Sequence, residues 1–101
     1  MTPEAKVKAQ IKKLLDTTHC YWFMPVTSGF GKAGVADFTV CANGRYVAVE
    51  AKAGKGKTTA LQDREADRVR AAGGISLVIN ETNLHELQNT LELINARTTT
   101  T

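Results

Sequence analysis

The fold of this chain is decided by residues 36–52, which read ADFTVCANGRYVAVEAK. Two runs of strand-forming residues, 36–42 and 45–51, flank the pair Asn43-Gly44. Asn-Gly between two such runs is the strongest short-range signal for a two-residue type I′ hairpin turn. The stretch therefore predicts two antiparallel strands in which Ala42 pairs with Arg45.

The register of this hairpin forces two carboxylates together. Counting outward from the turn places Asp37 opposite Glu50, where directly opposed Cβ atoms lie about 4.5–5.5 Å apart and like charges destabilise the sheet. Because side chains alternate along a strand, Lys52 shares their face of the hairpin. The opposite face is apolar and carries Phe38, Val40, Val47 and Val49.

Two explanations account for the acidic pair. A divalent cation would neutralise it, because Mg²⁺ or Mn²⁺ takes oxygen ligands and commonly uses one or two carboxylates, water and a substrate phosphate. Alternatively, Lys52 neutralises two structural carboxylates without a metal. Glu4 lies at the N-terminal end of the apolar stripe of a predicted helix, where it is either a third carboxylate of the site or a favourable charge at a helix N-terminus.

The remaining elements follow from hydrophobic periodicity and from Gly and Pro breakers. Helices are predicted over 3–18, 59–72 and 83–96, and further strands over 21–26 and 75–79. The order α-β-β-β-α-β-α predicts an α/β chain of α+β character, whose antiparallel sheet gains its last strand through a helical crossover. We expect one domain over residues 1–97 and a frayed tail over 98–101. The aromatic residues 21–23 are expected in the core, although such rings also stack on nucleic-acid bases.

Composition and charge narrow the classes of protein. Hydrophobic residues make up 43% of the chain and charged residues 23%, an ordinary globular balance, and no apolar run approaches the roughly 18–20 residues of a membrane span. The chain opens without an apolar leader, so we expect a cytoplasmic protein, in the host cytoplasm if a phage encodes it. Residues 1–57 carry +5 (nine Lys or Arg against four Asp or Glu) and residues 58–101 carry −2 (four against six), which predicts an anionic partner for the first half.

Together these residues resemble the PD-(D/E)xK nuclease superfamily and, more narrowly, stand-alone VRR-NUC domains of phage type. The similarity covers about residues 4–80. Ala36 departs from the pattern, which prefers Pro there, and this affects the stiffness of the backbone before Asp37. The segments that carry the resemblance in the family's order are Glu4, GVADF at 34–38, VEAKAGKGK at 49–57, Leu61-Gln62 and AAGG at 71–74.

The resemblance implies a restriction-endonuclease-like αβββαβ core, with a mixed sheet flanked by helices, and a Mg²⁺- or Mn²⁺-dependent DNA endonuclease that leaves a 5′-phosphate. In that pattern the metal is held by Asp37, Glu50 and the carbonyl of Ala51. Glu4 supports the metal directly or through water. Lys52 orients the attacking water or stabilises developing charge, and completes the catalytic set with Asp37, Glu50 and Gln62.

Gln62 has two possible roles. The resemblance implies that it positions Lys52 or the substrate. The run Thr59-Ala60-Leu61-Gln62 is also a helix capping box, in which the Gln side chain bonds back to the amide of the cap residue. Both roles are compatible with one side chain.

Three lysines are expected to contact DNA phosphates, namely Lys32, Lys55 and Lys57. A chain this small offers limited area for holding DNA, and symmetric dimers are the commonest oligomers, so we expect a homodimer. Two sites in one dimer would suit branched DNA such as a Holliday junction.

Two other functions stay open. One is a DNA-binding or partner-binding module that keeps the fold and lacks catalysis. The other is a nucleotide-binding protein, because AKAGKGKT at 51–58 fits a relaxed P-loop in which Ala replaces the first Gly. A P-loop strand normally lies in a parallel sheet, whereas Asn43-Gly44 places this strand in a hairpin, so we expect no nucleotide cofactor. We expect no membrane partner either.

Overall fold

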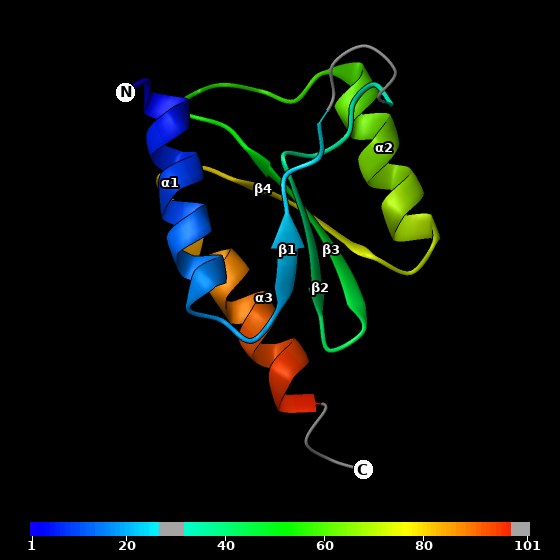
Figure 1. Ribbon diagram of the computed structural model, residues 1–101. Coiled ribbons are helices and arrows are strands. Elements are labelled where there is room, and N and C mark those ends of the chain that lie inside the picture. Colours follow the sequence, from blue (N-terminus) through cyan, green and yellow to red (C-terminus); the bar gives the residue numbers. More distant parts are fainter. Residues whose placement is uncertain (27–31, 98–101) are drawn as a thin grey trace.

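The computed structural model describes residues 1–26 and 32–97. Figure 1 shows α1 and α3 on one side of a central sheet and α2 on the other. The order of elements confirms the predicted α+β chain with an αβββαβ core, and the expected tail at 98–101 lies outside the described residues. The elements are α1 (Pro3–Asp16), β1 (Tyr21–Phe23), β2 (Phe38–Ala42), β3 (Arg45–Ala51), α2 (Ala60–Ala71), β4 (Ile75–Ile79) and α3 (Leu84–Arg97).

The sheet has four strands in the spatial order β1-β2-β3-β4. The first three strands pair antiparallel, and β4 pairs parallel with β3, so α2 is the predicted crossover. Ala42 pairs with Arg45, which confirms the register expected from the turn. Asn43 and Gly44 have φ of 48° and 81°, the two positive angles that a type I′ turn requires.

The core lies between the sheet and the two helices α1 and α3. In both helices the buried residues recur at helical spacing, which gives each helix one apolar face. The predicted apolar face of the hairpin is confirmed, because all four of its side chains are fully buried. The principal core residues are Val7, Ile11, Leu15, Phe38, Val40, Val47, Val49, Leu87 and Leu91.

The opposite face of the sheet is covered only in part. None of the residues of α2 is buried. Val78 of β4 is 43% exposed, because β4 lies at the edge of the sheet. On this face lies Glu50, which is the one buried polar or charged residue in the described parts of the chain.

The structure corrects two strand boundaries. The first strand ends at Phe23 rather than at residue 26, since Phe23 pairs with Thr39 and Pro25 has no N–H to offer a ladder. The second strand begins at Phe38 rather than at Ala36, so Asp37 directly precedes it.

The expectation that residues 21–23 all lie in the core is wrong at two positions. Trp22 packs against Phe38, with ring centroids 5.8 Å apart. Tyr21 and Phe23 are 70% and 47% exposed, because alternate side chains of a strand point to opposite faces of the sheet.

No helix in the described ranges is long and apolar enough to cross a membrane.

Candidate functional site

Asp37 and Glu50 meet at the end of the hairpin opposite its turn. Asp37 precedes β2, and its Oδ2 accepts a hydrogen bond of 2.8 Å from the backbone N–H of Ala51. Glu50, in β3, is only 8% exposed. Burial, and then the negative charge of Asp37, raise the pKa of Glu50 to about 7. The structure therefore brings the two carboxylates together and leaves their repulsion only partly compensated.

Lys52 provides one of the compensating charges. Its Nζ lies 3.4 Å from Oε2 of Glu50, and its side chain is only 15% exposed. The backbone N–H of Lys52 donates to the carbonyl of Ile79 at 3.0 Å, which ties the segment after β3 to β4. The positive charge of Lys52 opposes the rise in the pKa of Glu50 without cancelling it.

Gln62 links the start of α2 to the carboxylates. The capping box is confirmed: the Thr59 hydroxyl accepts from the Gln62 backbone N–H at 3.2 Å, and the Thr59 N–H donates to Oε1 of Gln62 at 2.9 Å. Because Oε1 is held by the cap residue, Nε2 is directed to Glu50, to whose Oε2 it donates at 2.9 Å. One amide thus caps the helix and orients the carboxylate of Glu50.

One oxygen of this cluster has no partner. Oε2 of Glu50 contacts both Lys52 and Gln62, whereas Oε1 is buried and has no hydrogen-bond partner among the residues that the structure describes. A buried acceptor left unsatisfied costs about 1–3 kcal/mol, and more when it is charged. A cation or a proton bound to this oxygen would remove that cost.

Lys8 of α1 also belongs to the site, and sequence reasoning did not select it. Its Nζ lies 3.6 Å from Oδ1 of Asp37 and 3.6 Å from Oε2 of Glu4. Glu4, whose side chain is 45% exposed, is thus joined to Asp37 through Lys8. The spacing of four residues between Glu4 and Lys8 on one helix was the signal that could have found it.

A cleft of about 480 Å³ opens beside these residues. Its walls come from α1, from the segment after β1, from the segment before β2 and from the start of α2. The lining includes Lys8, Pro25, Lys32, Asp37 and Gln62. Asp37 is therefore accessible from this cleft.

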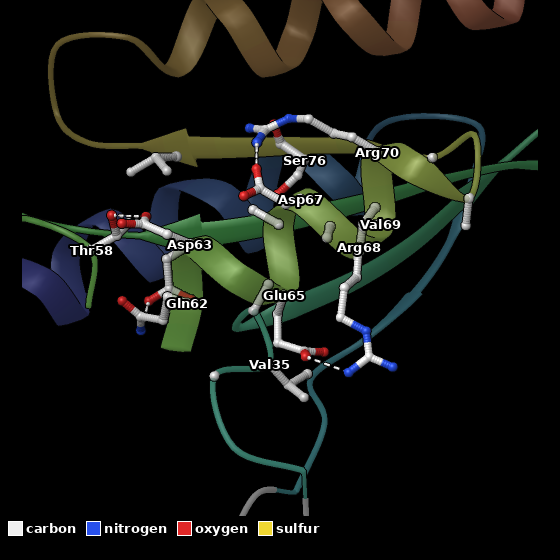
Figure 2. Close-up of a pocket in the computed structure, with 18 of the residues that line it drawn as sticks. Val35, Thr58, Gln62, Asp63, Glu65, Asp67, Arg68, Val69, Arg70 and Ser76 are labelled. Atoms are coloured by element: carbon white, nitrogen blue, oxygen red, sulfur yellow. Dashed lines mark hydrogen bonds and ion pairs between the residues drawn. The ribbon is translucent and has the colours of Figure 1, made fainter. Parts of the chain in front are cut away.

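A second hollow, of about 610 Å³, lies between α2 and the sheet. Glu50 and Gln62 are among its lining residues. Figure 2 shows Gln62 near one end of this hollow, with Glu65 and Arg68 farther along α2. Those two form an ion pair of 3.5 Å, so the helix satisfies part of its own charge. Asp37 lines the first hollow and Glu50 the second, and the residues common to both linings are Lys32, Gly34, Val35, Ala36 and Gln62.

The three lysines expected to bind DNA differ in their surroundings. Lys55 and Lys57 are exposed in the connection between β3 and α2. That connection is anchored where the backbone N–H of Gly54 donates to Glu81, at 2.8 Å to Oε1. Lys32 lies 3.0 Å from Glu65, and this contact lowers the pKa of the Glu65 carboxyl.

The donors at the site suit one kind of cation. The described residues contain no group of three or more His, Cys, Asp or Glu side chains able to hold a metal ion. Structural Zn²⁺ takes four protein ligands, whereas Mg²⁺ commonly uses one or two carboxylates and keeps water or substrate oxygens. Two adjacent carboxylates with one unpartnered buried oxygen fit the second pattern.

No protein-family model, curated protein or solved structure matches this chain. The assignment of a function therefore depends on the chemistry of the site.

Proposed function

We propose that the protein is a Mg²⁺- or Mn²⁺-dependent DNA endonuclease of the PD-(D/E)xK type, similar to VRR-NUC domains. The observation that carries the proposal is Glu50, a buried carboxylate beside Asp37 with one oxygen unpartnered. Buried charge is weak as a source of stability, because desolvation opposes the gain from pairing. A functional role accounts for this cluster better than a structural one.

In this proposal the metal is held by Asp37, Glu50 and the carbonyl of Ala51, with Glu4 in support. A divalent cation, when bound, neutralises phosphate charge and makes water a stronger acid. The chain itself sets the geometry of the ligands. The N–H of Ala51 holds Asp37, and Nε2 of Gln62 holds Glu50.

Lys52 is the residue proposed to act on the reacting groups. Its ammonium group can donate to the attacking water or to a phosphate oxygen on which charge develops. The contact of 3.4 Å with Glu50 keeps this ammonium group at the site before substrate arrives. The oxygen of the attacking water forms a bond to phosphorus as the bond from phosphorus to the 3′ oxygen breaks. One water proton ends on the departing 3′ oxygen and the other passes to solvent, which leaves a 5′-phosphate and a 3′-hydroxyl.

The substrate is proposed to be branched DNA, cut by a homodimer. Lys55 and Lys57 present two exposed positive charges on the connection between β3 and α2. Such charges attract phosphates without regard to base sequence. Phosphate contacts that do not depend on base sequence are consistent with an enzyme that selects DNA by its branched shape.

The test is cleavage of a panel of DNAs by the intact chain. Linear duplex, flap and four-way-junction DNA are incubated with Mg²⁺ or Mn²⁺, and the mass of the protein assembly is measured in parallel. We expect metal-dependent nicking with 5′-phosphate ends, lost at least 100-fold on Asp37→Asn or Glu50→Gln, as losses of this order accompany removal of a key electrostatic group. Glu92→Gln, a change of the same chemistry on α3, is the control and should keep activity.

The alternative functions give different results. DNA binding without nicking under any metal condition would favour a binding module. ATP binding that Lys57→Ala weakens would favour a P-loop protein. One contact speaks against the latter: the hydroxyl of Thr58, the last residue of the P-loop-like run, donates to Asp63 and is already engaged.

A further inference from the structure

Lys8 places a positive charge next to Asp37, one of the two carboxylates of the acidic pair. It reaches Asp37 from α1, a different element from those that bring Lys52 and Gln62 to Glu50. Its side chain is 30% exposed and lines the cleft. Each of the two central carboxylates thus has its own ammonium group.

The individual oxygens show what this ammonium group does. Oδ2 of Asp37 is committed to the N–H of Ala51, and Oε2 of Glu50 is committed to Gln62 and Lys52. The remaining oxygens are Oδ1 of Asp37, which contacts Lys8, and Oε1 of Glu50, which has no hydrogen-bond partner within residues 1–26 and 32–97. A cation that used both carboxylates would find one oxygen free and the other shared with Lys8.

We propose that Lys8 is a built-in competitor of the metal: it neutralises Asp37 in the metal-free protein and weakens the binding of a divalent cation to the same carboxylate. This inference rests on the metal site of the proposed function. Lys8 is a positioning residue in this scheme. It gives way to the cation and does not act on the reacting groups.

The contact is suited to being displaced. The distance of 3.6 Å is that of an ion pair without close hydrogen bonding, and Lys8 divides its charge between Asp37 and Glu4. Partly exposed pairs of this kind are weak, and a lysine stem is flexible enough to move its charge into the cleft. Glu4 would then remain as an acceptor for the displaced ammonium group.

The test compares Lys8→Met with Lys12→Met, a matched change one turn along α1 at an exposed lysine. Mn²⁺ binding is measured by isothermal titration calorimetry on the intact chain, and melting temperatures are recorded in EDTA and in Mn²⁺. We expect Lys8→Met to bind Mn²⁺ about 3- to 10-fold more tightly than the wild type, since a competing charge is removed. In EDTA its melting temperature should fall, because the repulsion between Asp37 and Glu50 is less compensated.

Two further variants separate competition from a structural role. Lys8→Arg keeps the charge and should keep Mn²⁺ affinity within about 2-fold of the wild type. In a background of Asp37→Asn, the substitution of Lys8 should no longer change Mn²⁺ affinity, because the shared ligand is gone. Loss of helix stability alone would lower the melting temperature and would not tighten Mn²⁺ binding.

The outcomes decide between the two proposals. Mn²⁺ uptake by the wild type that Lys8→Met leaves unchanged or weakens would overturn the competition and leave the nuclease proposal standing. Mn²⁺ uptake without nicking of any DNA would overturn the nuclease proposal alone, provided that Lys8→Met still binds more tightly. No Mn²⁺ uptake by either protein would overturn both.

Discussion

Four carboxylate oxygens define the site at the scale of single residues. Three of them have partners drawn from three different segments: Lys8 in α1, Ala51 and Lys52 at the end of β3, and Gln62 in α2. The fourth, Oε1 of Glu50, has no hydrogen-bond partner in the described part of the chain. The pKa of Glu50 is raised because burial, and then the negative charge of Asp37, disfavour the ionised form of its carboxyl.

This pKa predicts how stability depends on pH in EDTA. The pKa of Glu50 rises from its ordinary value of 4.5 to about 7 on folding, so the folded state binds the proton more tightly than the unfolded state does. The resulting stabilisation is fully present below about pH 4.5 and is lost as the pH rises through about 7. We expect the free energy of unfolding to fall across this interval, by up to about 1.4 kcal/mol for each unit of pKa difference.

Urea denaturation between pH 4 and pH 8 measures the effect. Glu50→Gln is the informative variant, because it keeps the shape of the side chain and cannot ionise. Its stability should be nearly flat over the same range. An equal slope in the variant would mean that another group is responsible.

At the scale of elements, Gln62 at the start of α2 makes two kinds of contact: it caps the helix, and it donates a hydrogen bond to Glu50. The cap bonds between Thr59 and Gln62 fix the first turn of the helix. The same Gln62 amide also donates to Glu50, and both side chains line the second hollow. The stability of the helix end and the orientation of the Glu50 carboxylate are therefore coupled.

Two substitutions separate these contributions. Thr59→Ala removes the hydroxyl cap and should cost about 1 kcal/mol of stability, as N-cap changes do. It keeps the backbone N–H that orients Gln62, so nicking activity should stay close to that of the wild type. Gln62→Leu keeps the bond from its backbone N–H to the Thr59 hydroxyl and loses both side-chain bonds, to the Thr59 N–H and to Glu50, so its activity should fall about 10-fold or more. Chemical denaturation and nicking rates measure the two effects, and equal activity losses in both variants would contradict the assignment.

The hairpin turn is the second element on which the site depends. Gly44 has φ of 81°, and a Cβ added there would meet no atom within 4 Å. The cost of Gly44→Ala is therefore conformational only, and we expect about 1 kcal/mol of destabilisation by urea denaturation. A much larger loss would show that the turn carries contacts besides its backbone conformation.

At the scale of the whole molecule, the charge is divided between the two halves of the chain. The positive excess lies in residues 1–57, which include α1, the hairpin and the two exposed lysines after β3. The site itself contains buried negative charge, and its surroundings are basic. That arrangement fits an anionic polymer approaching a cation site.

The salt dependence of DNA binding tests this distribution. Lys55→Ala and Lys57→Ala should each weaken binding and reduce the slope of log K against log salt by about one. Lys13→Ala, an exposed lysine on α1, is the control and should leave the slope unchanged. Fluorescence anisotropy over a range of KCl concentrations provides the measurement. Unchanged slopes in the two loop variants would remove these lysines from the DNA interface.

Much of the fold follows from local sequence. Asn43-Gly44 determines the hairpin register because its turn needs two positive φ angles, and alternation along the strands then assigns each side chain to a face. The capping box at Thr59 is likewise a contact between near neighbours. The order of helices and strands was predictable for the same reason.

Only the tertiary structure decided how the site is assembled. Two contacts join segments that are distant in the chain, that of Lys8 with Asp37 and that of Gln62 with Glu50. The same packing buries Oε1 of Glu50 without a hydrogen-bond partner among the described residues. Local patterns carry no information on such distances, which depend on how α1 and α2 pack against the sheet. The exposure of Tyr21 and Phe23 depends on the same packing, because a strand alternates its faces but only the helices determine which face is covered.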